Sequence, residues 1–428
     1  MKTDRIFSFA CVAAMAASLS GGVYASTATP VQQGHWVGTW SAPMAQASPT
    51  QKQLQVISAS GNQTIREIVH TSLGSASVRI RLANTFGSQA LSVDAVYVGL
   101  QQDGASLVHG SNHAVTFGGS GSVVIPAGGL ALSDAVPLTV GSEQNLVVSL
   151  FTDHAANGIT EHASALTTNY VASGNEAAQE TGDPFKTKLS SWLYLSGVDV
   201  LAAPEVKGSV VALGDSITDG SASKKDENGR WTDVLARRFL SGPAEDAMGV
   251  LNQGYGGNNV LTSTPCFAVN AVARVDRDVI SQTGVRDVIL LEGINDISQP
   301  DFAKTGKISA AILPCLSQRE VTAEEIIAGY KQIIAQTHEM GLKIFGGTLT
   351  PYEGFAGWTP AGEAKREAIN RWIRTSGAYD GIIDFAKAVA DPQSPQRFAP
   401  QYDSGDHLHP NTAGHKAMGE AIDLRLFR

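Results

Sequence analysis

The sequence predicts an all-β sandwich followed by an α/β domain, in which a parallel sheet carries helices on both faces. Two patterns predict these regions. In residues 31–200, short segments alternate apolar with polar residues, as half-buried strands do. In residues 206–428, apolar strand-like segments alternate with segments of helical periodicity. The length of 428 residues supports the division, because single cores stop growing at roughly 250–300 residues.

The first 25 residues have the pattern of a secretory signal peptide. Lys2 and Arg5 precede an apolar run from Ile6 to Leu19, and small residues lead to a predicted cleavage site after Ala25. This run is shorter than the roughly 20 residues of a membrane helix and is interrupted by serines, which argues against a membrane anchor. No later segment is apolar enough to span a bilayer. We therefore expect a secreted or periplasmic protein without a membrane partner after cleavage.

Alternation with a period of two, punctuated by Gly, Ser and Asn turns, predicts the strands of the N-terminal region. The clearest strand segments are residues 64–70, 77–82, 91–100, 122–128 and 145–151. Several short strands separated by turns indicate an antiparallel sandwich of jelly-roll or immunoglobulin-like type. Such a sandwich either binds carbohydrate or is a structural partner that shapes a neighbouring cleft, and no residue distinguishes the two roles.

After residues 201–208, which resemble a linker, strands begin to alternate with helices. The expected strands contain SVVALGDS, GVLNQGY, DVILLEGIN, KIFGGTLTP and GIIDF. The expected helices span about residues 231–240, 269–281, 323–340 and 361–376, with a last helix from about Asn411. In parallel sheets covered on both faces, ligands bind beyond the carboxyl ends of the strands. Polar residues that directly follow these strands are therefore the candidates for a functional site.

Charge and missing motifs exclude several classes of function. The formal net charge of −9 at pH 7 disfavours nucleic acids and anionic membrane surfaces as partners. The α/β region has no G-x-x-x-x-G-K phosphate loop and no G-x-G-x-x-G after its first strand, which argues against a nucleotide enzyme. We therefore expect no nucleic-acid partner and no cofactor.

The cysteines predict a disulfide. Of the three cysteines, Cys11 leaves with the signal peptide, so Cys266 and Cys315 remain as a potential pair in an oxidising compartment. A disulfide between them would close a loop of about 50 residues, which stabilises the folded protein by roughly 4 kcal/mol in the chain-entropy model. The alternative is two unpaired buried thiols. Two cysteines without C-x-x-C spacing make a poor zinc site, and we expect no metal.

Two polar stretches together contain the parts of an activated serine. LGDSITDG (213–220) places Ser216 at the end of a buried strand, and SGDHLHPNTAGH (404–415) places Asp406 and His409 three residues apart, just before a helix. A serine hydroxyl needs a base to take its proton, and that base needs an orienting partner. His407 is a rival base, but it is adjacent to Asp406, so its side chain is expected to project elsewhere. The alternative for this pair of histidines is a metal pair or a structural histidine.

Acyl transfer also needs hydrogen-bond donors for the developing oxyanion. The backbone amides of Ser216 and Gly257 and the side-chain amide of Asn295 are the candidates, from LNQGYGGNNV (251–260) and LLEGINDI (290–297). The spacing from Asn252 favours Gly257 over Gly256. Alternatively, Gly257 is only a turn residue and Asn295 is a helix cap. Two further carboxylates that flank the serine are interpreted as ordinary turn and support residues, namely Asp215 and Asp219.

In order and chemistry, the four stretches resemble the motifs of the SGNH, or GDSL-type, hydrolases, which are serine esterases on a flavodoxin-like sheet. The resemblance implies that Ser216 is the nucleophile and that Asp406 and His409 are the D-x-x-H pair. It also implies oxyanion-hole roles for Gly257 and Asn295. The G-x-S-x-G elbow of the α/β-hydrolases is absent, because Thr218 replaces its second glycine.

Both halves of the chain look similar to secreted arylesterases and acylhydrolases, some of which accompany xylan-degrading enzymes. The resemblance includes GTWSAP (38–43) and YDSGDHLHPN (402–411). The resemblance implies hydrolysis of short acyl or aryl esters, including acyl groups on plant polysaccharide, through an acyl-serine intermediate. Residues 298–318 are expected to form one wall or lid of the pocket, and Phe355 and Trp358 another. The acyl group, the oligomeric state and any contact of the sandwich with substrate stay open.

Two other classes of function compete with an esterase. One is a carbohydrate-binding protein with a non-catalytic SGNH-like domain, which the complete set of motif residues argues against. The other is a flavodoxin-like cofactor protein, which the signal peptide disfavours.

Overall fold

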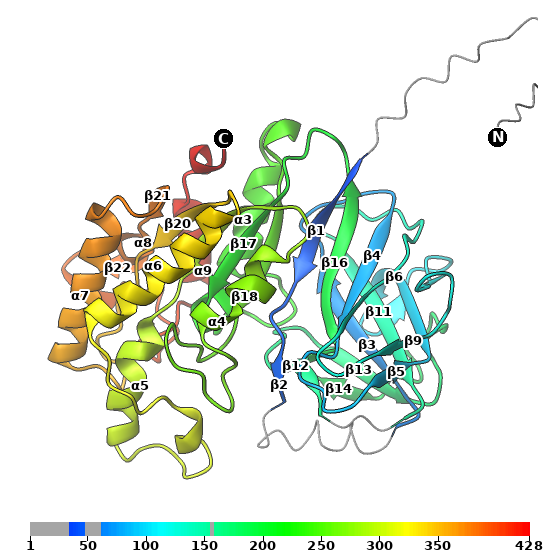
Figure 1. The fold of residues 1–428 in the computed structure, drawn as a ribbon, viewed down its shortest axis with the longest axis horizontal. Helices are drawn as coiled ribbons and strands as arrows, with labels where there is room; N and C mark the ends of the chain where they lie inside the picture. Colours follow the sequence, from blue (N-terminus) through cyan, green and yellow to red (C-terminus); the bar gives the residue numbers. More distant parts are fainter. Residues whose placement is uncertain (1–33, 48–60, 155–157) are drawn as a thin grey trace, which may run out of the picture. The chain divides into compact units, whose positions relative to one another are not determined.

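The computed structural model describes residues 34–47, 61–154 and 158–428 (Figure 1). The predicted signal peptide, residues 1–25, lies outside these residues. Residues Gly34 to Arg428 form a single compact unit. Across the described ranges, no helix is long and apolar enough to cross a membrane.

A parallel sheet forms the centre of the C-terminal part of the chain. Among the described residues it has five strands, in the order β18-β17-β19-β20-β21. Their bounds are β17 Ser209–Gly214, β18 Gly249–Gly254, β19 Val285–Leu291, β20 Lys343–Gly347 and β21 Gly381–Ile383. The second strand along the chain lies outside the first, which is the flavodoxin-like order. The sequence-based prediction of this fold class is confirmed.

Helices cover both faces of the parallel sheet. From β17 the chain adds β18 on one side of the sheet, and it then adds β19, β20 and β21 in turn on the other side. Because such crossovers are right-handed, the helix between β17 and β18 lies on the opposite face from the helices that connect the later strands. On one face, α3 packs on α9, and α9 packs on α8; on the other, α6 packs on α4 and α7, and α5 packs on α7. The bounds are α3 Trp231–Leu240, α4 Ala271–Val275, α5 Ile294–Lys304, α6 Ala323–Glu339, α7 Pro360–Thr375, α8 Phe385–Val389 and α9 Thr412–Ala421.

Local sequence signals explain where the long helices begin. At the start of α6, the Thr322 hydroxyl accepts a hydrogen bond from the N–H of Glu325, and the Glu325 carboxylate accepts one from the N–H of Thr322. This reciprocal pair is a capping box. Thr359 caps α7, whose first residue is Pro360, and proline is favoured at this position because its missing N–H has no helical partner there. Asn411 caps α9 in the same way. The predicted bounds of these helices therefore lie close to the observed ones.

The N-terminal part is an antiparallel β region with two main sheets. One has the order β1-β16-β4-β10, and the other β14-β13-β3-β11-β6-β7, with β8 on β6. Their bounds are β1 His35–Ser41, β3 Gln63–His70, β4 Val78–Ala83, β6 Ala95–Asp103, β7 Ser106–Leu107, β8 His113–Ala114, β10 Leu130–Leu132, β11 Asn145–Thr152, β13 Asn169–Ser173, β14 Thr187–Leu189 and β16 Leu195–Ala202. Buried apolar side chains of both sheets, such as Ile80 and Val148, share one core. This arrangement confirms the predicted β region.

Smaller strand groups complete the β region. A short sheet has the order β15-β12-β2, formed by β15 Trp192–Leu193, β12 Thr160–His162 and β2 Ala45–Gln46. A further pair joins β5 Leu91–Val93 to β9 Val123–Ile125. The predicted strand 91–100 is therefore two strands, because the pairing changes at Asp94.

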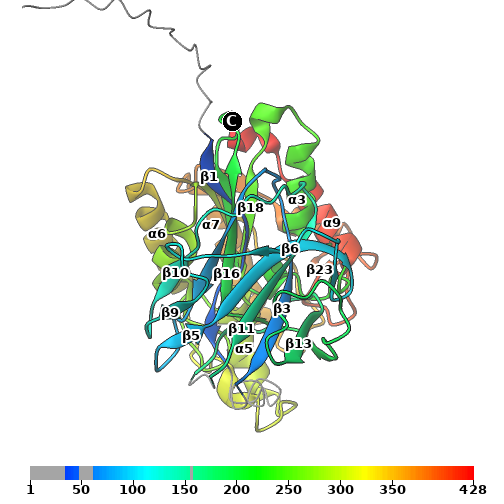
Figure 2. The same cartoon turned by 90° about the vertical axis from the view of Figure 1, so that its right-hand side faces the viewer.

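The β region lies against the outer strand of the parallel sheet (Figures 1 and 2). β18 is an edge strand, and an edge strand exposes unpaired backbone groups. The Ser72 hydroxyl accepts a hydrogen bond from the N–H of Val250 at 2.9 Å. The side-chain amide of Gln253 donates to Ser41 Oγ at 2.7 Å. Side chains of the β region thus cover the edge of β18, while the predicted domain boundary between residues 200 and 206 stays a prediction.

Residues 298–318 were expected to form a wall or lid of the pocket, and this role stays a prediction. Their first part continues α5, and Leu313–Cys315 form a short 3-10 helix. Pro300 lies inside α5, where it removes one backbone hydrogen bond. A proline in this position is a helix-breaking signal, which explains why the pattern did not indicate a helix here.

Candidate active site

Ser216 lies at the carboxyl edge of the parallel sheet, on the turn after β17. Asp215 caps the short helix α2 (Ser216–Asp219), because its carboxylate accepts the N–H of Ile217 at 2.9 Å. A Cβ at Gly214 would lie 2.2 Å from the Thr218 hydroxyl oxygen, so only glycine fits there. The G-D-S sequence thus combines a close backbone approach, a helix cap and a hydroxyl on the first residue of the helix.

Ser216, His409 and Asp406 form a chain of hydrogen bonds. Ser216 Oγ lies 2.8 Å from His409 Nε2, and His409 Nδ1 lies 2.6 Å from Asp406 Oδ2. The second carboxylate oxygen of Asp406 accepts the N–H groups of Leu408 and His409 and the hydroxyl of Ser404. The carboxylate thus orients the imidazole. With an ionised Asp406, Nδ1 donates to the carboxylate, and Nε2 accepts a hydrogen bond from the Ser216 hydroxyl.

The environment of Asp406 keeps it ionised. Burial acts to raise its pKa, but the hydrogen bond from His409, the charge of that imidazole and the two backbone N–H groups outweigh burial and hold the pKa well below its usual range. His407, the rival base, is directed elsewhere: its Nδ1 lies 2.5 Å from Asp403 Oδ2, and its side chain is half exposed.

Gly257 occupies a position that requires glycine. Its φ is +76°, and a Cβ there would lie 2.5 Å from the ring of Phe267. Its carbonyl oxygen accepts hydrogen bonds from the side-chain amides of Gln299 at 2.8 Å and Asn259 at 3.1 Å. The N–H of neighbouring Gly256 is engaged by Asp219, whereas the N–H of Gly257 has no acceptor among the described residues. This difference supports the choice of Gly257 over Gly256 as an oxyanion donor.

Asn295 lies on the first turn of α5, after β19. The N-cap of this helix is Gly293, with a φ of +123°, so Asn295 is not the cap. Its side-chain amide donates to the carbonyl of Asn258 at 2.9 Å, which places it beside the Gly257 loop. An amide has two N–H donors, so one remains for a ligand.

Arg274 holds together the loops that carry Ser216 and Gly257, and the sequence analysis did not find this residue. The side chain is fully buried and donates to the carbonyls of Gly214 and Gln253, both at 2.8 Å, and to the side-chain oxygen of Asn258 at 2.9 Å. One guanidinium therefore holds the ends of β17 and β18 and the Gly257 loop together. The signal that could have found it is a charged residue on the buried face of a short amphipathic helix.

Buried carboxylates surround this arginine. Burial raises the pKa of Asp215 to about 6, against the opposing effects of the Ile217 N–H, His409 and Arg274. Burial also raises the pKa of Glu292 well above its usual range, and the neighbouring Asp215 raises it further, while Arg274 at 3.5 Å opposes the shift. Arg274 thus places a positive charge beside this group of buried acids.

The β region reaches the site through His162, which the sequence reasoning also missed. His162 Nε2 lies 3.1 Å from Asp219 Oδ1, and its Nδ1 lies 3.1 Å from the carbonyl oxygen of Pro43. Burial acts to lower the pKa of His162, but the Asp219 charge and hydrogen bond outweigh it and raise the pKa. The other oxygen of Asp219 accepts the N–H of Gly256. Nothing in the residues around His162 marks it in the sequence.

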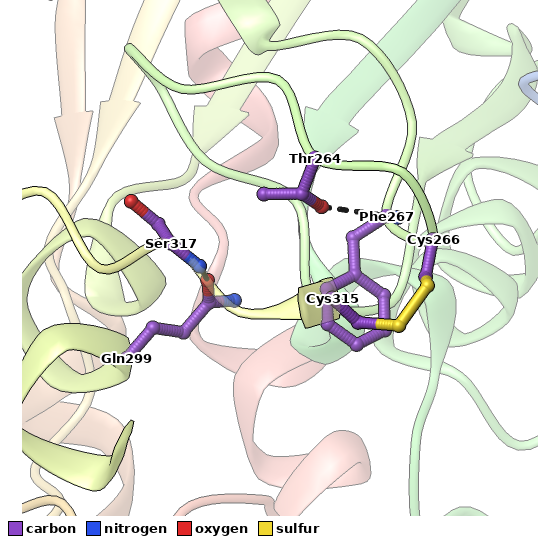
Figure 3. The surroundings of a disulfide bond; sticks show 6 residues. All are labelled: Thr264, Cys266, Phe267, Gln299, Cys315 and Ser317. Carbon is purple, nitrogen blue, oxygen red and sulfur yellow. Dashed lines mark hydrogen bonds between the residues drawn. A yellow bond between two sulfur atoms is a disulfide. The ribbon is translucent and has the colours of Figure 1, made fainter. Parts of the chain in front are cut away.

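Cys266 and Cys315 form a disulfide, which confirms the predicted pair (Figure 3). The bridge joins the loop after β18 to the short 3-10 helix after α5. Both bonded segments also contact the Gly257 loop. Phe267, next to Cys266, packs on Gly257, and Gln299 accepts the N–H of Ser317 at 2.8 Å while it donates to Gly257.

The parallel sheet and a family match define the class of this protein, which is a carboxylic ester hydrolase. The matched residues are 212–417, and they are a domain of the GDSL-like Lipase/Acylhydrolase family, preceded by the N-terminal β region. The family implies ester substrates.

Solved structures with a similar fold align with about half of this chain. A GDSL-like lipase from Bacteroides thetaiotaomicron is 16% identical, with a TM-score of 0.35, and the match covers 51% of this chain and 87% of that chain. A catalytic mutant of an acetylxylan esterase from Geobacillus stearothermophilus is 21% identical, with a TM-score of 0.38, and the match covers 51% of this chain and 93% of that chain. A search of curated proteins found no match to this chain.

Proposed function

We propose that Ser216, His409 and Asp406 are the catalytic residues of a serine esterase that hydrolyses carboxylic esters through an acyl-serine intermediate. The hydrogen-bond chain from Ser216 Oγ through His409 to Asp406 carries the proposal, with links of 2.8 Å and 2.6 Å. A weak nucleophile next to an oriented base is the arrangement that acyl transfer requires.

In the first half of the reaction, Ser216 Oγ attacks the ester carbonyl carbon, and its proton passes to His409 Nε2. The carbonyl double bond opens to a tetrahedral oxyanion, which collapses and breaks the bond to the alcohol oxygen. His409 gives its proton to that oxygen, so the alcohol leaves and an acyl-serine remains. Asp406 stays ionised and stabilises the imidazolium that forms between these steps.

In the second half, water replaces the alcohol. His409 takes a proton from the water molecule, whose oxygen attacks the acyl carbon. The second tetrahedral intermediate collapses, and the proton on His409 returns to Ser216 Oγ. The products are a carboxylic acid and the regenerated serine, so the atoms of one ester and one water are accounted for.

The proposed oxyanion hole consists of the N–H groups of Ser216 and Gly257 and the side-chain amide of Asn295. The free N–H of Gly257 and its fixed carbonyl support this role, since preorganised donors stabilise the developing charge most. Loss of one such donor typically lowers turnover by about 10²- to 10³-fold.

The proposed substrates are short acyl or aryl esters, including acyl groups on plant polysaccharide, and the proposed location is secreted or periplasmic. The four motifs and the N-terminal signal pattern support these finer assignments. The disulfide supports the location, because disulfides persist in oxidising compartments.

The test of this function is Ser216→Ala. The variant should lose about 10⁴-fold or more of kcat on 4-nitrophenyl acetate, since no hydroxyl remains to form the acyl-enzyme. A fluorophosphonate should label the wild-type protein at Ser216 and leave the variant unlabelled.

Ser223→Ala is the matched control, because Ser223 is also buried and follows the same helix without joining the hydrogen-bond chain. It should keep near wild-type turnover and labelling. Wild-type turnover by a folded Ser216→Ala protein would refute the proposed mechanism.

A further inference from the structure

A cavity of about 200 Å³ lies beside the Gly257 loop, and several segments of the chain form its walls. The β region contributes residues 162–164, and the loop after β18 contributes Tyr255 and Gly256. The disulfide forms the third wall, together with Phe267 and Ile312. Figure 3 shows the ring of Phe267 beside the bridge between Cys266 and Cys315.

This cavity is adjacent to the proposed reaction centre. Gly256 lines it, and the peptide bond from Gly256 to Gly257 carries the N–H that we assign to the oxyanion hole. Asp219, which also lines it, is on the same short helix as Ser216. An ester whose carbonyl oxygen accepts the Gly257 N–H therefore has its reacting carbon next to the cavity wall.

The imidazole and the carboxylate that line the cavity are already engaged. The carboxylate of Asp219 is held by His162 on one oxygen and by the N–H of Gly256 on the other. His162 uses its second nitrogen on the carbonyl of Pro43. Most of the remaining lining is apolar surface, from Ala163, Phe267, Ile312 and the disulfide, and Ser164 and Tyr255 complete it. The cavity therefore offers an occupant apolar contact rather than a charge partner.

The walls are fixed in place. The disulfide joins two of the wall segments covalently. The carbonyl of Phe267 accepts the side-chain amide of Asn258 at 2.8 Å, and its N–H donates to Thr264 Oγ1 at 3.2 Å (Figure 3). A preformed apolar pocket binds a fitting group at little cost in ordering.

We propose that this cavity binds an apolar group of the ester, about the size of one aromatic ring, so that the β region takes part in substrate selection. This inference rests on the proposed function, because it places the reacting carbonyl at the Gly257 loop. The size follows from the volume, since an apolar cavity of roughly 150 Å³ accommodates benzene. The ring belongs either to the acyl half or to the alcohol half of the ester, and the two halves are tested separately.

The test fills the cavity with Ile312→Trp. Ile312 is 41% exposed, so a larger side chain there does not overpack a core. Hydrolysis is followed by proton release for methyl acetate, phenyl acetate and methyl benzoate. We expect kcat/KM to fall by tenfold or more for one of the two aromatic esters and to change less than twofold for methyl acetate. The ester that loses activity identifies the half that occupies the cavity.

Ile382→Trp is the matched control, because Ile382 is also 41% exposed but lies on β21, outside the cavity. It should change none of the three rates. Ala163→Leu narrows the cavity from the opposite wall and should reproduce the selective loss. Equal effects of Ile312→Trp on all three esters, or no effect, would overturn the cavity assignment.

The two proposals fail in different ways. If Ser216 is not labelled by a fluorophosphonate in the wild-type protein, the proposed function fails, and the cavity assignment fails with it. If labelling and methyl acetate hydrolysis persist while cavity-filling variants do not discriminate among the esters, only the cavity assignment fails.

Discussion

At the scale of single residues, the side-chain amide of Gln299 connects the Gly257 loop to the segment that contains Ser317. It donates to the Gly257 carbonyl at 2.8 Å, and its oxygen accepts the Ser317 N–H at 2.8 Å and the Asn259 amide at 3.2 Å. Its side chain is buried. Gln299 touches no reacting atom in the proposed mechanism, so its role is to position Gly257.

Removing this amide should misplace the proposed oxyanion donor. Gln299→Leu should lower kcat by about 10- to 100-fold, because small displacements of a catalytic donor are costly, while KM changes little. Steady-state kinetics on 4-nitrophenyl acetate measures the two constants. Gln299→Glu keeps the acceptor for Ser317 but loses the donor to Gly257, so it should not restore kcat.

Gln282→Leu is the control for this prediction. Gln282 is another buried glutamine, and its amide donates to the carbonyl of Arg277, away from the Gly257 loop. It should affect the free energy of unfolding but not kcat. Equal kcat losses in the two leucine variants would mean that Gln299 acts only through general stability.

At the scale of elements, β19 carries a carboxylate in a strand that is buried on both faces. Asp287 is fully buried, and neither of its carboxylate oxygens has a hydrogen-bond partner among the described residues. Burial raises its pKa to about 6, although Arg286 and Lys343 oppose the shift. The carboxylate ionises at about pH 4 in the unfolded chain, so the folded state binds the extra proton between about pH 4 and pH 6.

This shift predicts a pH-dependent cost to stability. Because the folded-state pKa is raised, the free energy of unfolding should fall as pH rises from about 4 through 6, by roughly 2–3 kcal/mol from this group. Asp287→Asn, which stays neutral, should be more stable than wild type at pH 8 and no more stable at pH 4. Urea unfolding at the two pH values measures the difference.

Asp103→Asn is the matched control, because it replaces an exposed carboxylate rather than a buried one. A stability gain by Asp287→Asn that is the same at pH 4 and pH 8 would contradict an ionisation effect.

At the scale of the whole molecule, the backbones of the β region and of the parallel-sheet region approach closely at Gly38 and Gly249, beside the side-chain contacts that also join the two regions. A Cβ at Gly249, the first residue of β18, would lie 2.1 Å from the carbonyl oxygen of Gly38 in β1. The N–H of Gly38 donates to the carbonyl of Thr283 at 2.9 Å. So close an approach leaves no space for a side chain at Gly249.

Such close contact should make the two regions unfold together. Gly249→Ala forces β1 away from β18 and should cost about 1–3 kcal/mol, as overpacking does in cores. Calorimetry should show one transition for wild type and one transition at lower temperature for the variant. Gly121→Ala, where a Cβ meets no atom within 4 Å, should leave the transition unchanged. Two separate transitions in the wild-type protein would contradict this coupling.

Local spacing explains which parts of the site could be predicted. Asp406 and His409 are three residues apart on one loop, and Ser216 directly follows a buried strand, so short stretches of sequence carry these features. The alternation of strands and helices predicted the parallel sheet for a similar reason, because periodicity is a local property. The disulfide was predicted because only two cysteines, Cys266 and Cys315, remain after removal of the predicted signal peptide.

The supporting residues could not be predicted in this way. Arg274, His162 and Gln299 each bind groups that are distant along the chain. His162 and Asp219 are 57 positions apart, and no sequence pattern relates them. α5 was also missed as a helix, because Pro300 is a local signal against the helix that its neighbours form.

The sequence by itself determined the four polar stretches and most of the order of strands and helices along the chain, and it predicted the disulfide pair, because each depends on residues close together or on simple counting. Only the tertiary structure decided that a histidine of the β region holds Asp219, that a buried arginine joins the strand ends, and that an apolar cavity borders the Gly257 loop. These contacts arise when distant segments pack against one another, and the free energy that selects them belongs to the whole folded chain rather than to any one stretch.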